Sequence, residues 1–136
     1  MERVAEKVEK LNRLSGEILD ASIEVHRVLG GPGLLESIYE EALARELSLR
    51  GIEVQRQVQI PVAYKGAMVR DSLVLDLLVA GKVIVEVKSV EKFNPIFASQ
   101  LLTYLRLSNN SLGIIVNFGE KFVKDGFHRV VNRFPV

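Results

Sequence analysis

Residues 83–88 read Val-Ile-Val-Glu-Val-Lys, and this stretch indicates the fold class. Three consecutive apolar residues are typical of a strand that is buried on both faces, inside a sheet covered by helices. A charge in such a strand is costly unless it has a partner. Glu86 and Lys88 nevertheless stand at its end, two positions apart and therefore on one face. The stretch predicts a central strand that ends in a polar site.

A second apolar run, residues 75–79, also carries one charged residue, Asp76. If residues 80–82 (Ala-Gly-Lys) form the loop between the two runs, the strands pair as a hairpin. In that register Asp76 lies opposite Glu86, with their Cβ atoms roughly 5 Å apart. Two carboxylates and the ammonium of Lys88 then share one place on an otherwise apolar sheet.

Two carboxylates at this distance repel each other, and without a cation one of them should hold a proton. We therefore expect a hard divalent cation, Mg²⁺ or Mn²⁺, bound by Asp76 and Glu86, to which the Val87 carbonyl could add a ligand. Lys88 could then position or deprotonate a water, or stabilise charge on a phosphate. The alternative is that Glu86 and Lys88 form an exposed ion pair on an edge strand, worth under ~1 kcal/mol.

The rest of the chain alternates between helical and strand patterns. Apolar residues recur every three or four positions in the first long segment, which is a helical pattern, and Gly30–Gly33 ends it. The strand at 112–118 follows a helix, so we expect it to lie parallel to residues 83–88 through a right-handed crossover. The predicted class is α/β, a mixed sheet flanked by helices. The expected elements are helices at about 11–29, 34–50 and 94–107, strands at 52–62, from 68, at 75–79, 83–88 and 112–118, and a strand or short helix within 121–132.

Composition limits the class of protein. The 136 residues are 48% hydrophobic and 26% charged, as in a folded globular protein, and include no cysteine. We expect one domain over residues 1–136, with residues 1–14 as an N-terminal helical extension, in a reducing cytoplasm. Neither a signal peptide nor a membrane span is expected. Net charge is +1, but residues 49–136 carry 12 basic and 7 acidic side chains, a balance of +5 that could present a basic face to phosphates.

Two motifs in the chain resemble those of a known family. Asp76, then Glu86-Val87-Lys88, then Gln100 on the next expected helix are similar to the pattern of the PD-(D/E)XK nuclease superfamily. Residues 33–39, Gly-Leu-Leu-Glu-Ser-Ile-Tyr, resemble the motif that names one of its branches, the small bacterial and archaeal GxxExxY proteins. The resemblance runs from about residue 15 to Asn132. It implies the restriction-endonuclease-like α/β core.

The resemblance also implies roles for single residues. Asp76 and Glu86 match the two principal metal ligands, and Lys88 matches the catalytic lysine. Glu36 matches a helical acidic residue that ligates or orients the metal, and Gln100 matches a glutamine that supports the site from the following helix. Two other interpretations stay open, since the helix dipole also favours an acidic residue in a first turn and Gln100 could be an ordinary surface residue.

Further residues bear on these expectations. The chain departs from the branch at Leu73 and Val74, which occupy positions often held by an aromatic residue and an arginine. Tyr39 is expected in the core with its hydroxyl hydrogen-bonded. His26 and His128 lack the spacing of metal ligands, so no metal role is expected for them.

The residues and the resemblance together predict a metal-dependent nuclease that hydrolyses phosphodiester bonds of nucleic acid. A chain of 136 residues leaves little room for sequence readout, so we expect specificity for structure or ends. The alternative is a catalytically inactive module on the same fold that binds nucleic acid or a protein. A homodimer is a further option, and nothing in the sequence separates DNA from RNA.

Overall fold

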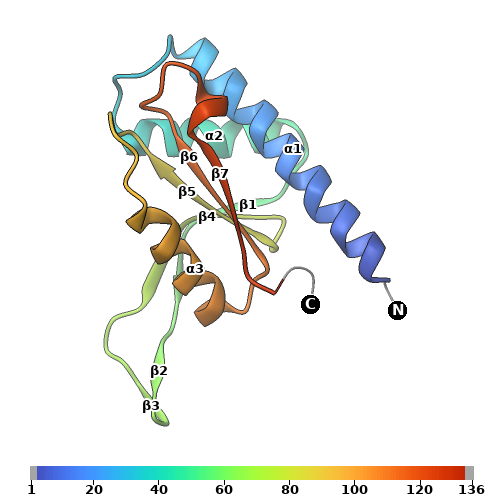
Figure 1. Cartoon of the computed structure of the whole chain (residues 1–136), viewed down its shortest axis with the longest axis vertical. Coiled ribbons are helices and arrows are strands. Elements are labelled where there is room, and N and C mark those ends of the chain that lie inside the picture. The colour runs from blue at the N-terminus through green and yellow to red at the C-terminus, as the bar shows by residue number, and fades with distance from the viewer. Residues whose placement is uncertain (1–2, 134–136) are drawn as a thin grey trace.

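The computed structural model describes residues 3–133 and contains a five-stranded mixed sheet flanked by helices, which is the predicted α/β class (Figure 1). The strand order is β1-β4-β5-β6-β7, and β2 and β3 form a separate two-stranded ribbon. The elements are α1 Val4–Val28, α2 Glu36–Leu49, β1 Val54–Ile60, β2 Ala63–Tyr64, β3 Ala67–Met68, β4 Leu73–Val79, β5 Val83–Lys88, α3 Ile96–Ser108, β6 Leu112–Asn117, the short 3₁₀ helix η1 Val123–Gly126, and β7 Phe127–Val131.

The two most completely buried strands, β5 and β6, lie side by side within the sheet. β5 and β6 are parallel, from Val83 beside Leu112 to Lys88 beside Asn117, and α3 makes the crossover between them. The expected parallel pairing is therefore confirmed. Every residue of β6 is buried, and so is every residue of β5 except Lys88. Continuous apolar sequence gives a strand covered on both faces, as in parallel sheets generally.

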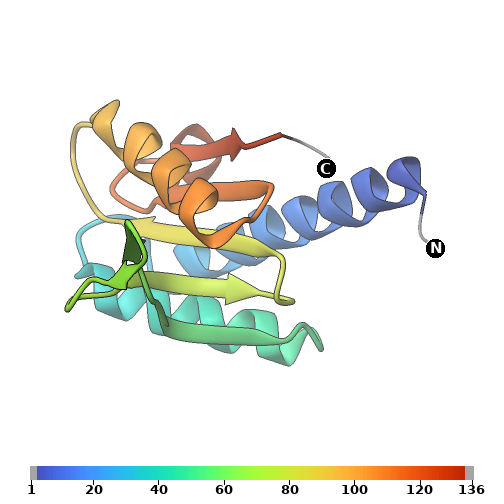
Figure 2. The same ribbon diagram turned by 90° about the horizontal axis from the view of Figure 1, so that it is seen from below.

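Helices cover both faces of the sheet, so two apolar cores form. α1 and α2 lie on one face and α3 lies on the other (Figure 2). Ile18 of α1 and Leu43 of α2 pack in the first core with Val85 of β5. Leu101 of α3 packs in the second core with Ile84. Glu86 has the same parity as Ile84, so it belongs to the α3 face of the sheet.

β1 and β4 change face halfway along their length. Val54 packs against the core under α1 and α2, whereas Val58, four residues on, packs against the core under α3. In an undistorted strand residues of equal parity share a face. Gln57 lies between them with a φ of 51°, a backbone conformation that turns the strand locally. On β4, Leu77 and Leu75 divide between the same two cores, and Asp76 is the residue between them.

Three expectations need adjustment. The strand expected from residue 68 is present only as the two-residue β3, Ala67–Met68, which pairs with Ala63–Tyr64 outside the main sheet, and the main sheet resumes at Leu73. The segment 121–132 contains both of the expected alternatives, because a short 3₁₀ helix is followed there by a strand. The expected extension at 1–14 is the first part of α1 from Val4 onward, while residues 1–2 lie outside the described part of the chain. Among residues 3–133, no helix combines the length and the apolar character that crossing a membrane requires.

Candidate functional site

Asp76 and Glu86 face each other on the neighbouring strands β4 and β5. At this point hydrogen bonds to side-chain carboxylates replace the backbone hydrogen bonds between the two strands. The ladder runs from Val79 beside Val83 to Leu77 beside Val85, as the expected register requires. At the next position the Asp76 N–H donates to Glu86 Oε2 at 2.8 Å. In return the Val87 N–H donates to Asp76 Oδ2 at 2.9 Å. Each carboxylate therefore bonds the backbone of the opposite strand.

The pair is electrostatically unfavourable as it stands. Glu86 is only 8% exposed, and burial together with the charge of Asp76 raises its pKa to about 8. Burial also raises the pKa of Asp76, although the hydrogen bond from Val87 acts in the opposite direction. Near neutral pH the metal-free pair thus carries a proton on Glu86. A cation placed between the two carboxylates would remove that penalty.

Lys88 ends β5 on the same face as Glu86, as its position two residues on requires. Its Nζ lies 4.6 Å from the centre of the Phe97 ring of α3, within the range of a cation–π contact. Its charge lowers the pKa of both carboxylates, so it is electrostatically coupled to the pair. The alternative of an exposed ion pair on an edge strand does not apply, because β5 is a central strand and Glu86 is buried.

Glu36 is the first residue of α2 and reaches the segment that follows β5. Its Oε2 accepts a hydrogen bond from the Ser89 N–H at 3.4 Å, and the Ser89 hydroxyl donates to the Leu34 carbonyl at 2.7 Å. The charge of Glu36 contributes to the raised pKa of Asp76. Glu36 therefore belongs to the electrostatic neighbourhood of the pair, while its place in the first turn also suits the helix dipole.

Tyr39 fixes the direction of α2. It is fully buried, and its ring stacks on Phe118 with centroids 4.5 Å apart. Its hydroxyl donates to the Gly31 carbonyl at 2.7 Å and accepts from the Leu34 N–H at 3.2 Å. The expected core position with a bonded hydroxyl is confirmed. Through this contact the glycine-rich loop before α2 is tied to the helix that carries Glu36.

Glu40 is a site residue that the sequence reasoning missed. It is 6% exposed and accepts hydrogen bonds from Arg56 at 3.1 and 3.2 Å and from the Gln57 amide at 2.8 Å. Its charge raises the pKa of both Asp76 and Glu86. A usable signal was present, since Glu40 follows Glu36 by one helical turn and so shares its face of α2.

On α3, Gln100 is exposed, and its side chain makes no hydrogen bond with any group of residues 3–133. One turn later, Tyr104 is half-buried, and burial and the charges of Glu86 and Asp76 raise the pKa of its hydroxyl. Tyr104 was not singled out from the sequence, although its spacing from Gln100 places both on one face of the helix.

The chain matches a family model over most of its length. Residues 12–130 match the model of the PD-(D/E)XK nuclease superfamily. The chain belongs to this superfamily. Neither a curated protein nor a solved structure gave a match. Membership suggests a nuclease-type function on nucleic acid, and nucleases of this superfamily generally use divalent metals.

The residues of the pair fit a hard divalent cation by the chemistry of their donors. Mg²⁺ binds through one or two carboxylates and keeps several waters, and the buried Glu86 and the half-buried Asp76 offer two carboxylates. The Val87 N–H points to β4, and N–H and carbonyl of one strand residue point to the same side, so the Val87 carbonyl also lies on the Asp76 side. Across residues 3–133, no three His, Cys, Asp or Glu side chains gather as a metal-binding group. Backbone oxygen and water would have to complete the coordination.

The histidines stand apart from this arrangement. His26 Nε2 lies 3.0 Å from the Glu120 carbonyl, and the ring of His128 stacks on Phe93 with centroids 4.1 Å apart.

Asn117 is a structural support of the site that the sequence did not predict. It is fully buried, and its amide exchanges two hydrogen bonds of 3.0 Å with the backbone of Val90. It thereby fixes the chain just after Lys88.

Proposed function

We propose that the protein is a metal-dependent nuclease of the GxxExxY branch, which hydrolyses phosphodiester bonds with Mg²⁺ or Mn²⁺. The observation that carries the proposal is the pairing of Asp76 and Glu86, a half-buried and a buried carboxylate that face each other across the neighbouring strands β4 and β5. Such a pair is costly in a structural role, because burial and mutual repulsion disfavour its charge. It suits a protein that recruits a divalent cation.

In this proposal Asp76 and Glu86 are the principal metal ligands, with the Val87 carbonyl as a further one. A bound divalent cation supplies an activated water and offsets the charge that develops on the phosphate. Lys88 extends from the same face of β5, so its ammonium orients the attacking water or stabilises the phosphorane oxygens. The Phe97 ring holds that ammonium by a cation–π contact.

Glu36 and Gln100 act around this centre. Glu36 ligates or orients the metal, supported by its bond to the Ser89 backbone directly after Lys88. Gln100 lies on the exposed face of α3, where it is available to a substrate or to Lys88. The proposed catalytic residues are therefore Asp76, Glu86, Lys88, Glu36 and Gln100.

The substrate is proposed to be recognised by structure or by its ends. A fold of this size within residues 1–136 offers backbone contacts and few groups for base readout. A single domain, a cytoplasmic location and a homodimer are parts of the same proposal. They rest on the one five-stranded sheet that the helices flank, on the absence of cysteine from the sequence, and on the exposed apolar side chains, respectively.

The experiment is cleavage of labelled DNA and RNA, single- and double-stranded, in Mg²⁺, in Mn²⁺ and in EDTA. Glu86→Gln keeps the size and the acceptor for the Asp76 N–H but removes the charge, so cleavage should stop. Glu91→Gln, at an exposed position in the following loop, is the matched control and should cleave normally. Metal-independent binding with no cleavage of any substrate would instead favour the inactive binding module.

A second measurement separates metal binding from turnover. In thermal unfolding, Mg²⁺ or Mn²⁺ should raise the Tm of wild type and of Glu91→Gln, because a ligand that binds the folded state stabilises it. The same addition should leave Glu86→Gln unchanged. An equal shift in all three proteins would mean that the cation binds elsewhere.

A further inference from the structure

A groove to which no role has yet been given lies at the end of the sheet where β4 turns into β5, away from Asp76 and Glu86. Figure 2 shows the β4–β5 turn, the α3–β6 connection and the N-terminal half of α1 at one end of the molecule, while β5 ends at the other. Glu86 lies three residues along β5 from Val83, so about 10 Å of strand, at about 3.3 Å per residue, separates it from the end of the sheet that carries the groove, and neither Asp76 nor Glu86 lines that groove. The groove is therefore distinct from the site described above.

Three hollows with shared walls form this groove. The first has a volume of ≈ 460 Å³, lies between α1 and the β4–β5 turn, and shares Lys10 and Lys82 with the second, of ≈ 210 Å³. The second shares residues 109–111 of the α3–β6 connection with the third, of ≈ 450 Å³. The three hollows thus follow one another around this end of the sheet. We call this continuous surface the basic groove.

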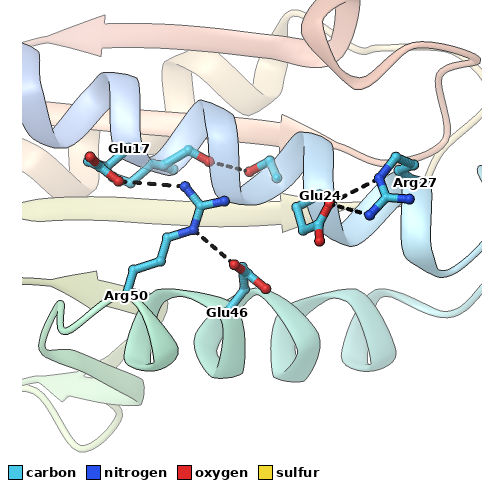
Figure 3. Close-up of polar contacts among 7 residues, drawn as sticks. Glu17, Glu24, Arg27, Glu46 and Arg50 are labelled. Atoms are coloured by element: carbon cyan, nitrogen blue, oxygen red, sulfur yellow. Dashed lines mark hydrogen bonds and ion pairs between the residues drawn. The ribbon is translucent and has the colours of Figure 1, made fainter.

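Basic side chains dominate the lining of the basic groove. The first hollow is lined by four of them, Lys10, Arg13, Arg50 and Lys82, and by one acidic residue. That acid, Glu17, lies 3.5 Å from Arg50, which also bonds Glu46 at 2.9 Å (Figure 3). Arg50 is therefore neutralised within the protein and holds α1 to α2.

Within the described part of the chain, the other two hollows add basic residues and no acidic one. Lys7 lines the second hollow, and Arg106 and Arg133 line the third. Asparagine amides and a serine supply the remaining polar lining there. Among residues 3–133, seven basic residues and one acidic residue line the groove, in a chain whose net charge is +1. Positive charge is therefore concentrated at this groove, since the chain as a whole is nearly neutral.

We propose that the basic groove binds the phosphate backbone of a nucleic acid, on a segment other than the one at the carboxylates. A row of Lys and Arg side chains along a continuous concave surface matches the regular charge of a polynucleotide. The proposal rests on nucleic acid being the partner in the proposed function, and it does not require cleavage. By anchoring a distant segment, the groove raises the local concentration of a long substrate at the active site.

An anionic membrane is the competing partner for a basic surface. Helices that bind membranes insert large apolar side chains, aromatic ones in particular, beside their basic residues. The basic groove is concave, and no aromatic side chain among residues 3–133 lines it. Nucleic acid is therefore the partner that its shape and chemistry favour.

The test compares two triple variants that lose the same charge. The groove variant combines Lys7→Gln, Lys82→Gln and Arg106→Gln, all at exposed positions. The control variant changes three basic residues outside the groove: Lys65→Gln, Lys121→Gln and Lys124→Gln. The probe is a labelled DNA duplex of about 30 base pairs, roughly 100 Å long at about 3.4 Å per base pair, bound in EDTA and followed by fluorescence anisotropy against salt.

We expect the groove variant to lose about 100-fold in affinity at about 0.1 M salt, and its plot of log K against log salt to flatten by about 3, near one unit for each lost phosphate contact. The control variant should retain the wild-type slope, and Lys82→Arg should bind as wild type. Equal losses in both triple variants would overturn the proposal, since net charge alone would explain them. So would groove-dependent binding to phosphatidylserine vesicles with unchanged DNA binding.

The two proposals can fail separately in this design. If the groove variant loses affinity but no protein cleaves any substrate in Mg²⁺ or Mn²⁺, the groove stands and the catalytic proposal falls. If cleavage is metal-dependent and abolished by Glu86→Gln, while the groove variant binds DNA with the wild-type slope, the nuclease stands and the groove is refuted.

Discussion

Glu86→Gln should make the protein more stable at alkaline pH in the absence of metal. Glu86 has a folded-state pKa of about 8, against an ordinary value of 4.5. The difference of about 3.5 units corresponds to about 5 kcal/mol at about 1.36 kcal/mol per unit. This is a large share of the 5–15 kcal/mol, roughly, that stabilises a typical domain.

The sign follows from proton binding. Because the folded-state pKa is raised, the folded protein holds a proton on Glu86 between pH 4.5 and about 8 that the unfolded chain has released. Stability is therefore greatest below the unfolded pKa and falls as pH rises through this window. From pH about 5.5 to about 9 the wild type should lose about 3 kcal/mol. The raised pKa of Asp76 acts in the same direction.

The assay is urea unfolding in EDTA, at steps from pH about 5.5 to about 9, on wild type, Glu86→Gln and Glu91→Gln. Glutamine resembles the protonated acid, so Glu86→Gln should lack most of the pH dependence, whereas Glu91→Gln should follow wild type. Mg²⁺ should also reduce the loss in wild type, since a cation held by the pair favours its charged form.

The reasoning is refuted if wild type is as stable at pH about 9 as at about 5.5 in EDTA. It is equally refuted if Glu86→Gln keeps the wild-type slope, because the titrating group would then lie elsewhere. A parallel loss of helical circular dichroism in both proteins at pH about 9 would point to general alkaline unfolding instead.

Three further predictions concern the supports of the site and are measured by urea unfolding. Asn117→Ala should cost about 3 kcal/mol, because it leaves part-buried backbone groups of Val90 and Gly119 without their partner; Asn117→Asp should recover the acceptor role. Gly119→Ala should cost about 2 kcal/mol or more, since a Cβ would lie 2.2 Å from the Val90 carbonyl oxygen. Tyr39→Phe should cost about 1 kcal/mol by losing the 2.7 Å bond to Gly31, and a cost near zero would contradict that bond's role.

The centre of the fold could be predicted because its signals are local and agree with each other. Continuous apolar runs marked β5 and β6 as buried strands, and the short Ala-Gly-Lys loop set the register that places Asp76 against Glu86. The helix after β5 was also marked, since Asn94 accepts a hydrogen bond from the Ile96 N–H at 3.0 Å and so caps α3 as its residue type predicts.

The face change of β1 had no comparable signal. Residues 52–62 alternate well enough to predict one continuous strand, but alternation cannot locate a residue with positive φ. Gln57 adopts φ of 51°, which is uncommon for a residue other than glycine, and only tertiary contact identifies it. Its amide is held by Glu40 at 2.8 Å, a partner distant in sequence.

This distortion and the carboxylate pair occupy the same row of the sheet. The β1–β4 pairs on either side place Gln57 opposite Asp76, and the β4–β5 register continued by one residue places Glu86 opposite it. In an undistorted sheet the Val87 N–H would bond the Leu75 carbonyl and the Asp76 N–H would point to β1, so neither carboxylate would receive these hydrogen bonds. Because the strands turn here, the Asp76 and Val87 N–H groups are available to the two carboxylates. Backbone strain of this kind persists only where surrounding contacts fix it, and Glu40 provides such a contact. Glu40 therefore links the shape of the strand to the electrostatics of the pair.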